Sequence, residues 1–192
     1  MTNERKIRIG ITQGDTNGIG YEVILKTFSN PAMLELCTPV IYGSSKIMSY
    51  HRKAVGVQAF QTNNVKSVDY LKENLPNVVE VCSDEVKVEL GKADKQAGKA
   101  AFLALEAAIT DLKKGKIDAI VTAPISKENI QSAEFNFPGH TEYLEASVGE
   151  GSKALMVLFS EKIRVALVTI HLPIAEVPKA ITKDLIKEKL RI

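Results

Sequence analysis

The sequence has no tryptophan, only two cysteines and three histidines, and no apolar run long enough to cross a membrane. The two cysteines, Cys37 and Cys82, form neither a disulfide framework nor a metal motif, so we expect two reduced thiols. Residues 1–12 are no signal peptide, because Arg8 and Gly10 interrupt their short apolar stretch. These absences predict a cytoplasmic protein without a membrane partner.

The charge balance is nearly even, with 25 basic and 23 acidic residues among 192 and a formal net charge of +2. Such a balance argues against nucleic acid or an anionic membrane as the main partner. A composition that is 45% hydrophobic and 25% charged is typical of a globular protein with a sizeable core. A small anionic ligand stays open, because local charge decides its binding.

Apolar stretches with strand spacing alternate along the chain with stretches of helical spacing, which predicts an α/β protein with a largely parallel or mixed sheet. Two apolar runs near the end, 155–159 and 165–169, are expected to pair as strands across a short turn. A short helix is expected from Ser126, and 62–77 carry no prediction. The other predicted strands cover 6–12, 39–42, 57–60, 78–82 (at a sheet edge) and 117–122 (buried), and the other helices 21–28, 46–55, 97–114, 141–148 and 182–190.

We divide the chain into a first α/β domain over 1–130 and the truncated start of a second over 131–192. The last predicted helix runs into Arg191 and Ile192 without glycine, proline or a polar cap. This ending indicates a chain cut inside a larger protein, with an ordinary frayed terminus as the alternative.

The first motif is the glycine-rich turn G-D-T-N-G-I-G at 14–20, which follows a strand and opens a helix. Glycines let a ligand approach the backbone, and the helix start offers N–H groups to an anion. Asp15 and Gly18 are therefore candidate anion contacts, although a purely structural turn is an equal alternative. The spacing fits neither the Rossmann nor the P-loop pattern.

The second motif, T-A-P-I-S-K at 122–127, lies where a predicted strand ends. Ligands of open α/β sheets gather at the carboxyl ends of the strands. Lys127 is a candidate anion contact and Ser126 a candidate helix cap. The alternative is an ordinary connection with a solvated lysine.

The three histidines receive different predictions. His140 and Thr141, in F-P-G-H-T-E, offer an imidazole and a hydroxyl at a helix start and are candidate substrate contacts. The alternative makes Thr141 a helix cap and His140 a solvated turn residue. His171 ends an apolar strand before Pro173 and is a candidate metal ligand, with His140 as a second, although a lone histidine is more often structural. His51 has no motif around it and is expected on the surface.

Together these segments resemble the 4-hydroxythreonine-4-phosphate dehydrogenase family. The family pattern reads G-D-P-A-G-I-G-P-E, T-A-P-I-x-K, G-H-T-E and T-x-H-L-P-L. The sequence matches it in order at 14–22, 122–127, 139–142 and 169–174, so the resemblance spans the chain from about Ile7 to its end.

The resemblance implies a fold like that of isocitrate and isopropylmalate dehydrogenases, with two α/β domains around a cleft. It implies a homodimer whose metal ligands come from both subunits. By the same resemblance, His140 and Thr141 bind the substrate and His171 binds a divalent metal, with zinc, magnesium, manganese and cobalt open. No residue is assigned a catalytic role.

The implied activity is that of an NAD- or NADP-dependent oxidoreductase of pyridoxine biosynthesis. It would oxidatively decarboxylate 4-phosphohydroxy-L-threonine, a small phosphorylated hydroxy acid, to an amino-ketone phosphate. One alternative is a dehydrogenase of D-threonate or D-erythronate 4-phosphate. A further alternative is an inactive fragment that acts only as a binding domain.

The sequence departs from the family in two respects. Thr16 and Tyr21 replace the two prolines of the first motif, which predicts a looser turn. No histidine follows His171, whereas the family's two other metal histidines lie beyond position 192. We therefore expect the 192-residue chain by itself to be inactive.

Overall fold

The structure, a computed structural model, describes residues 5–82, 87–149, 151 and 153–192. The chain forms two compact units, Met1–His140 and Thr141–Ile192. None of the helices in the described ranges is long and apolar enough to cross a membrane. Whether these units are the two expected domains stays a prediction.

The first unit is built on a five-stranded sheet in the order β3-β4-β2-β1-β5. Every neighbouring pair of strands is parallel, which confirms the predicted α/β class. The strands are β1 (Arg8–Thr12), β2 (Thr38–Gly43), β3 (Asn63–Val65), β4 (Asn77–Glu80) and β5 (Ala119–Thr122).

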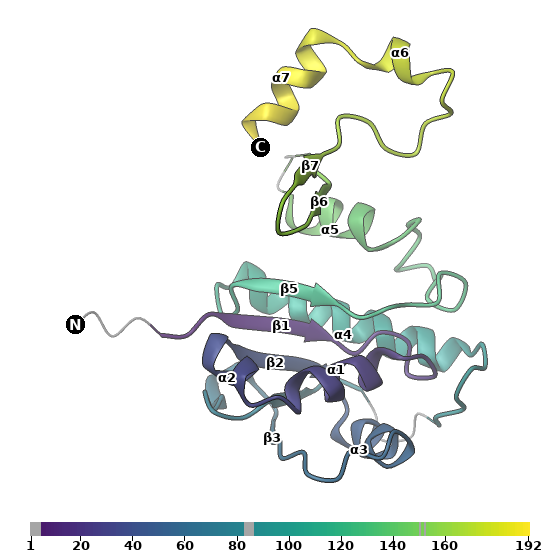
Figure 1. The fold of residues 1–192 in the computed structure, drawn as a ribbon. Helices are drawn as coiled ribbons and strands as arrows, with labels where there is room; N and C mark the ends of the chain where they lie inside the picture. Colours follow the sequence, from purple (N-terminus) through teal and green to yellow (C-terminus); the bar gives the residue numbers. More distant parts are fainter. Residues whose placement is uncertain (1–4, 83–86, 150, 152) are drawn as a thin grey trace. The chain divides into compact units, whose positions relative to one another are not determined.

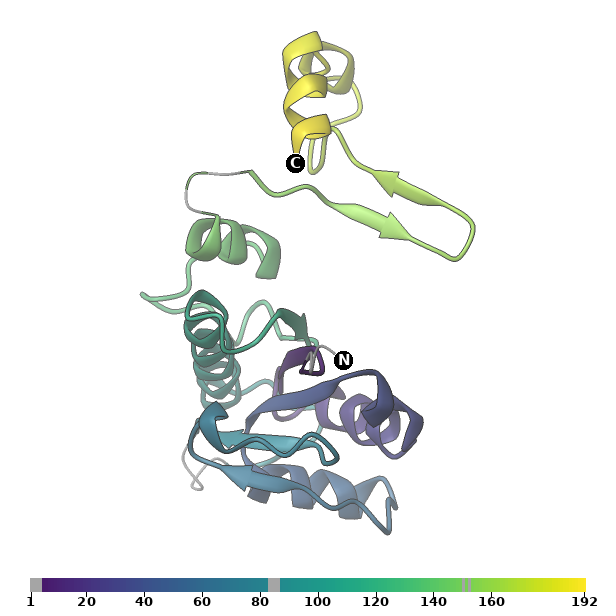
Figure 2. The same cartoon turned by 90° about the vertical axis from the view of Figure 1, so that its left-hand side faces the viewer.

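Helices cover both faces of this sheet (Figures 1 and 2). Neighbouring strand residues point to opposite faces, so Ile41 packs with one set of helices while Val40 and Tyr42 pack on the other side. One face carries α1 (Gly20–Phe28), α2 (Ala32–Leu36) and α3 (Ser45–Ala54), and the other carries α4 (Lys95–Lys113). A single 3-10 turn, Val68–Tyr70, precedes β4.

Local signals account for how these helices start and stop. The Ser44 side chain accepts from the backbone N–H of Ile47 at the start of α3, and Asp94 accepts in the same way from Gln96 at the start of α4. Gly115 follows α4 with φ +64°, the left-handed conformation that ends many helices. The predicted helices over 21–28, 46–55 and 97–114 are confirmed to within about two residues.

Four predictions about the strands and helices of the first unit are wrong. No strand forms at 57–60, because the third strand lies at 63–65, in the polar segment without a prediction. β4 is not at an edge, since it lies between β3 and β2. β5 is not buried, because it ends the described sheet and Val121 is 54% exposed. Residues 127–130 form one turn and no helix.

The second unit contains short elements. Two strands, β6 (Val157–Phe159) and β7 (Arg164–Ala166), pair antiparallel as predicted. The helices are α5 (His140–Val148), which starts at the last residue of the first unit, α6 (Val177–Ala180) and α7 (Lys183–Arg191). Thr182 caps α7 by accepting from the backbone N–H of Leu185, in agreement with the helix predicted over 182–190.

Candidate functional site

Two loops meet at the carboxyl edge of the first unit's sheet, one after β1 and one after β5. They lie together because β1 and β5 are neighbouring parallel strands, with Thr12 opposite Thr122. The backbone N–H of Asp15 donates to the Pro124 carbonyl at 2.9 Å. Gly14 has φ +70°, and a Cβ there would lie 2.3 Å from the Pro124 oxygen. Only glycine allows this close approach.

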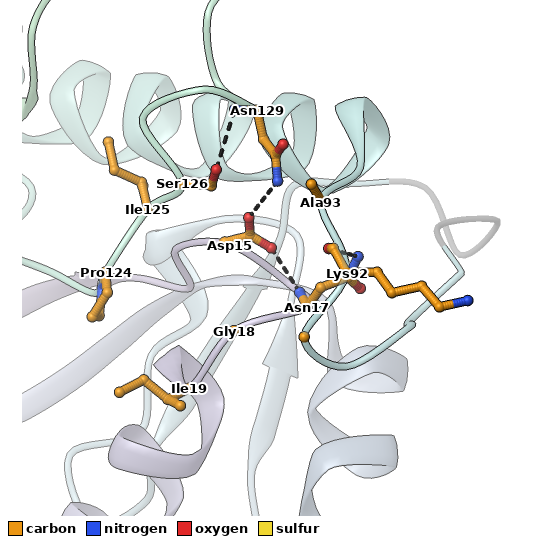
Figure 3. A pocket seen from close by; sticks show the side chains of 11 residues that line it. Asp15, Asn17, Gly18, Ile19, Lys92, Ala93, Pro124, Ile125, Ser126 and Asn129 are labelled. Carbon is orange, nitrogen blue, oxygen red and sulfur yellow. Dashed lines mark hydrogen bonds between the residues drawn. The ribbon is translucent and has the colours of Figure 1, made fainter.

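The Asp15 carboxylate is almost fully buried and joins these loops. Its Oδ1 accepts from the backbone N–H of Asn17 at 2.8 Å, and its Oδ2 accepts from the Asn129 amide at 3.0 Å (Figure 3). A carboxylate whose two oxygens both accept gives an anion no donor. The geometry therefore makes Asp15 a support for the loop, and its role as an anion contact stays a prediction.

Asn17 joins the same turn to the segment before α4. Its side chain donates to the Lys92 carbonyl at 3.1 Å and accepts from the backbone N–H of Glu89 at 2.8 Å. The backbone N–H of Gly91 donates to the Asn17 carbonyl at 2.9 Å. Three separate segments of the chain are thus held together at one edge of the sheet.

These segments line an open pocket of about 410 Å³ (Figure 3). Its volume falls in the range of small-molecule sites. Gly18 lines it, as the anion prediction requires, whereas Lys127 is exposed and is not part of the lining. The lining consists of Asp15, Asn17, Gly18, Ile19, Gly91, Lys92, Ala93, Pro124, Ile125, Ser126 and Asn129.

His51 lies in the core, which corrects its expected surface position. Its side chain is on the buried face of α3 with Ile47 and Met48, and the residue is only 2% exposed. Nε2 lies 2.8 Å from the Thr16 carbonyl oxygen. Burial lowers the pKa of the imidazole, so the neutral ring donates this hydrogen bond at neutral pH.

The turn after β1 is anchored by a buried tyrosine at one of the two positions where the related pattern has proline, and whether the loss of the prolines loosens the turn stays a prediction. Tyr21 is fully buried, and its hydroxyl donates to Oε1 of Gln13 at 2.5 Å. The hydroxyl accepts from the backbone N–H of Ser44 at 2.8 Å. Thr16 has a buried hydroxyl without a hydrogen-bond partner among the described residues, but its carbonyl accepts from His51.

His140 and Thr141 open α5, which confirms the predicted helix start, whereas their contact with a substrate stays a prediction. The His140 ring is partly buried, and burial lowers its pKa, so it is neutral at pH 7. Thr141 and Glu142 line a second pocket of about 350 Å³ that lies within the second unit. The other residues lining this pocket are Glu145, Ala146, Gly151, Lys153 and Ile170.

His171 lies beside this second pocket on an unusual backbone. Among the described residues it alone, apart from glycines, has a positive φ, at 55°. A side chain in this region costs about 1–2 kcal/mol, which makes it a candidate functional residue. Its Nε2 lies 3.8 Å from Oε1 of Glu142, and its side chain is 75% exposed. The structure thus brings the predicted metal ligand close to Glu142, the last residue of the G-H-T-E motif.

His171 and Glu142 supply only part of a metal site. Within the described ranges, no three histidine, cysteine, aspartate or glutamate side chains are close enough to hold a metal ion. An exposed imidazole beside a carboxylate fits one position of such a site. The role of His140 as a further ligand stays a prediction.

Sequence reasoning missed several residues that the geometry brings to these pockets, and three of them carry polar groups that matter here. Asn129 and Lys92 line the first pocket, and Glu142 approaches His171. Asn129 follows the T-A-P-I-S-K motif by two residues, so a search of the whole loop would have found it. Lys92 follows Gly91 and lies two residues before the helix cap Asp94, which is a weaker signal.

Comparisons with known proteins agree on one family. The model of the pyridoxal phosphate biosynthetic protein PdxA family matches residues 35–192. A 4-hydroxythreonine-4-phosphate dehydrogenase of Bacteroides thetaiotaomicron is 60% identical over 189 residues, which cover 98% of this chain and 52% of that protein. A D-threonate 4-phosphate dehydrogenase of Cupriavidus necator is 32% identical, covering 95% of this chain and 55% of that protein.

A solved structure is similar over the same extent. The crystal structure of a 4-hydroxythreonine-4-phosphate dehydrogenase from Burkholderia phymatum superimposes with a TM-score of 0.86 at 27% identity. The match covers 98% of this chain and 57% of that one. The chain therefore spans just over half the length of the relatives that it matches.

Proposed function

Because this chain belongs to the family of the pyridoxal phosphate biosynthetic protein PdxA, we propose that the complete polypeptide is a 4-hydroxythreonine-4-phosphate dehydrogenase. One observation carries the proposal, namely 60% identity over 98% of the chain to a relative with that name. The four motifs, which occur in the order of the family pattern, are part of this similarity and agree with the proposal.

The proposed reaction is the oxidation of 4-phosphohydroxy-L-threonine by NAD or NADP, followed by decarboxylation to an amino-ketone phosphate. The proposed fold is that of isocitrate dehydrogenase, with two α/β domains around a cleft, in a cytoplasmic homodimer. The chain covers about half the length of its relatives, and in this proposal the other ligands belong to the part of the complete polypeptide outside these 192 residues.

His140 and Thr141 are proposed to bind the substrate. Both lie in the first turn of α5, where backbone N–H groups have no partner within the helix and favour an anion such as a phosphate. The Thr141 hydroxyl can donate or accept a hydrogen bond. Neutral His140 can also do either, because burial lowers its pKa.

His171 is proposed to hold one position of a divalent metal site, for zinc, magnesium or cobalt. Such an ion, when bound, would supply Lewis-acid polarisation of the substrate hydroxyl. The Glu142 carboxylate lies 3.8 Å from Nε2, which is beyond hydrogen-bond distance but close enough for a charge interaction with the imidazole. Its negative charge also favours a cation at this position.

A second candidate is the oxidation of D-threonate 4-phosphate, which carries a hydroxyl where the first substrate carries an amine. A 32% identical relative with that activity in its name supports this candidate. The greater identity of the first relative favours 4-phosphohydroxy-L-threonine.

The test measures turnover of the purified full-length protein with both substrates side by side, with D-erythronate 4-phosphate as a third. Each is offered with NAD and with NADP, after removal of metal and again after addition of zinc, magnesium or cobalt. We expect the highest kcat/KM for 4-phosphohydroxy-L-threonine and none without metal. A higher value for D-threonate 4-phosphate would transfer the proposal to the second candidate, and no turnover of any of them would refute both.

The 192-residue chain measured in parallel is expected to be inactive. Its described residues supply His171 and no complete metal cluster. Turnover by this chain alone would show that the proposed division of ligands between the two halves is wrong.

A further inference from the structure

A chain of buried hydrogen bonds surrounds the turn after β1. The Tyr21 hydroxyl links Gln13 to the backbone N–H of Ser44, and the Gln13 side chain in turn donates to the Ala100 carbonyl at 3.0 Å. Gln13, Tyr21 and Ser44 are each fully buried. This chain therefore connects the end of β1 to α1, to the start of α3 and to α4.

The neighbouring backbone leaves space for these contacts only because residue 43 is glycine. A Cβ at Gly43 would lie 2.3 Å from the Tyr21 hydroxyl and 2.7 Å from Oε1 of Gln13. Such distances do not occur in real structures, so any larger residue would displace the hydrogen bonds. Gln13, Tyr21 and Gly43 therefore fit together in a single hydrogen-bonded arrangement.

His51 holds the middle of the same turn from α3. Its Nε2 donates to the Thr16 carbonyl, and its ring packs against that of Tyr21 with 5.2 Å between ring centroids. Thr16 lies between Asp15 and Asn17, which both line the first pocket. A shift of Thr16 would therefore move the residues that line the pocket.

We propose that Tyr21 and His51 are positioning residues that hold residues 14–20 in the shape that binds a ligand in the first pocket. The turn contains three glycines and neither of the prolines of the related pattern, so its own backbone imposes little rigidity. Buried hydrogen bonds that would be left unsatisfied on opening supply the rigidity instead. The hydrogen bonds and packing of Tyr21 and His51 support their role in holding the turn. Only the effect of the turn on the reaction rests on the proposed function.

Variants of the full-length protein test it. Tyr21→Phe removes one hydroxyl, His51→Leu removes the imidazole donor, and His51→Gln restores an N–H donor. Tyr42→Phe is the matched control, because Tyr42 is equally buried and its hydroxyl donates to Asp111 at 2.9 Å on the opposite face of the sheet.

Hydrogen exchange of the backbone N–H groups of Asp15, Asn17 and Gly18 measures how often the turn opens. All three groups donate hydrogen bonds within the turn or to Pro124. We expect exchange about tenfold faster in Tyr21→Phe and His51→Leu. His51→Gln is expected to restore slow exchange, and Tyr42→Phe to leave it unchanged. Equal exchange in all variants, or equal acceleration in Tyr42→Phe, would overturn the proposal.

Steady-state kinetics supply the functional readout. We expect Tyr21→Phe and His51→Leu to raise KM for the nicotinamide nucleotide or the hydroxy-acid phosphate at least about tenfold, with kcat changed less. Tyr42→Phe is expected to lower the stability of the protein without changing KM. Unchanged KM with faster exchange would refute a role in binding, whereas an inactive wild-type protein would refute the proposed function and leave the exchange result to decide on the turn.

Discussion

His171 combines a positive φ of 55°, an exposed imidazole and a carboxylate 3.8 Å away. If His171 holds the proposed metal, His171→Ala in the full-length protein is expected to abolish turnover, because the substitution would remove that ligand without removing packing. Stability should change by no more than about 0.5 kcal/mol, as for other exposed side chains. Titration calorimetry with zinc measures the metal affinity of the variant. Urea unfolding measures its stability, so the two effects can be told apart.

The control for this variant is Lys179→Ala, an exposed residue of α6 in the same unit. It should leave metal affinity and turnover unchanged. Retention of full zinc affinity in His171→Ala would show that His171 is no ligand.

A second prediction for a single residue concerns the effect of replacing Gly14 on stability. Gly14→Ala places a Cβ 2.3 Å from the Pro124 carbonyl oxygen at a φ of +70°, so both a steric clash and backbone strain result. We expect a loss of about 2 kcal/mol or more in the free energy of unfolding. The midpoint of urea unfolding measures this loss.

Gly56→Ala is the matched variant for Gly14→Ala. Gly56 has a φ of +71° but no atom within 4 Å of an added Cβ, so only strain remains. Its expected cost is about 1 kcal/mol. Equal costs at the two positions would contradict the close approach of the two loops.

We expect the stability of the protein to depend on pH because the imidazole of His51, in helix α3, is buried. Burial lowers the pKa of the folded imidazole below its usual 6.5, despite the opposing effects of the Thr16 carbonyl and Glu22. The unfolded chain therefore binds a proton first as pH falls below about 6.5. Stability is full above that pH and decreases below it, until the folded state is protonated as well.

Urea unfolding at pH 7.5 and 5.5 measures this effect. We expect the wild-type protein to lose more stability between these values than His51→Gln does, since glutamine does not titrate. His140, whose pKa is also lowered by burial, contributes equally in both proteins. An identical loss in the two proteins would show that His51 does not control the pH dependence.

The elements with strong periodic signals were predictable from sequence. The apolar spacing of α4 and the alternation of β1 fixed both elements to within about two residues. β3 was missed because its sequence, N-N-V, carries no apolar alternation and forms only by pairing with β4. Local sequence does not encode such a pairing.

The position of His51 was predictable in part. Residues 47, 48 and 51 share one face of a helix, and two of them are apolar, so this periodicity could have placed His51 in the core, although we expected it on the surface. What sequence could not supply is the partner, because the Thr16 carbonyl lies 35 residues away. The hydrogen bond between Asp15 and Asn129 could not be predicted for the same reason, because the two residues are 114 positions apart in the sequence.

At the scale of the whole chain, the second unit exposes a large apolar area. Large side chains on its hairpin are strongly exposed, among them Leu158 at 57% and Phe159 at 70%. Helix α7 adds Leu190 at 80%. Monomeric proteins rarely expose contiguous apolar patches beyond a few hundred Å². The relatives are nearly twice as long as this chain, so a longer polypeptide has residues available to cover such an area.

We therefore expect the 192-residue chain, produced alone, to associate as its concentration rises. Leu158→Lys combined with Phe159→Glu should reduce this association, because the two charges resist burial. The exposed pair Lys179→Glu and Glu176→Lys, on the same unit, serves as a charge-neutral control. Sedimentation velocity over a hundredfold range of concentration measures the result. A monomeric wild-type chain across that range would show that the hairpin is stable in water without a covering partner, and the apolar side chains would then need another explanation.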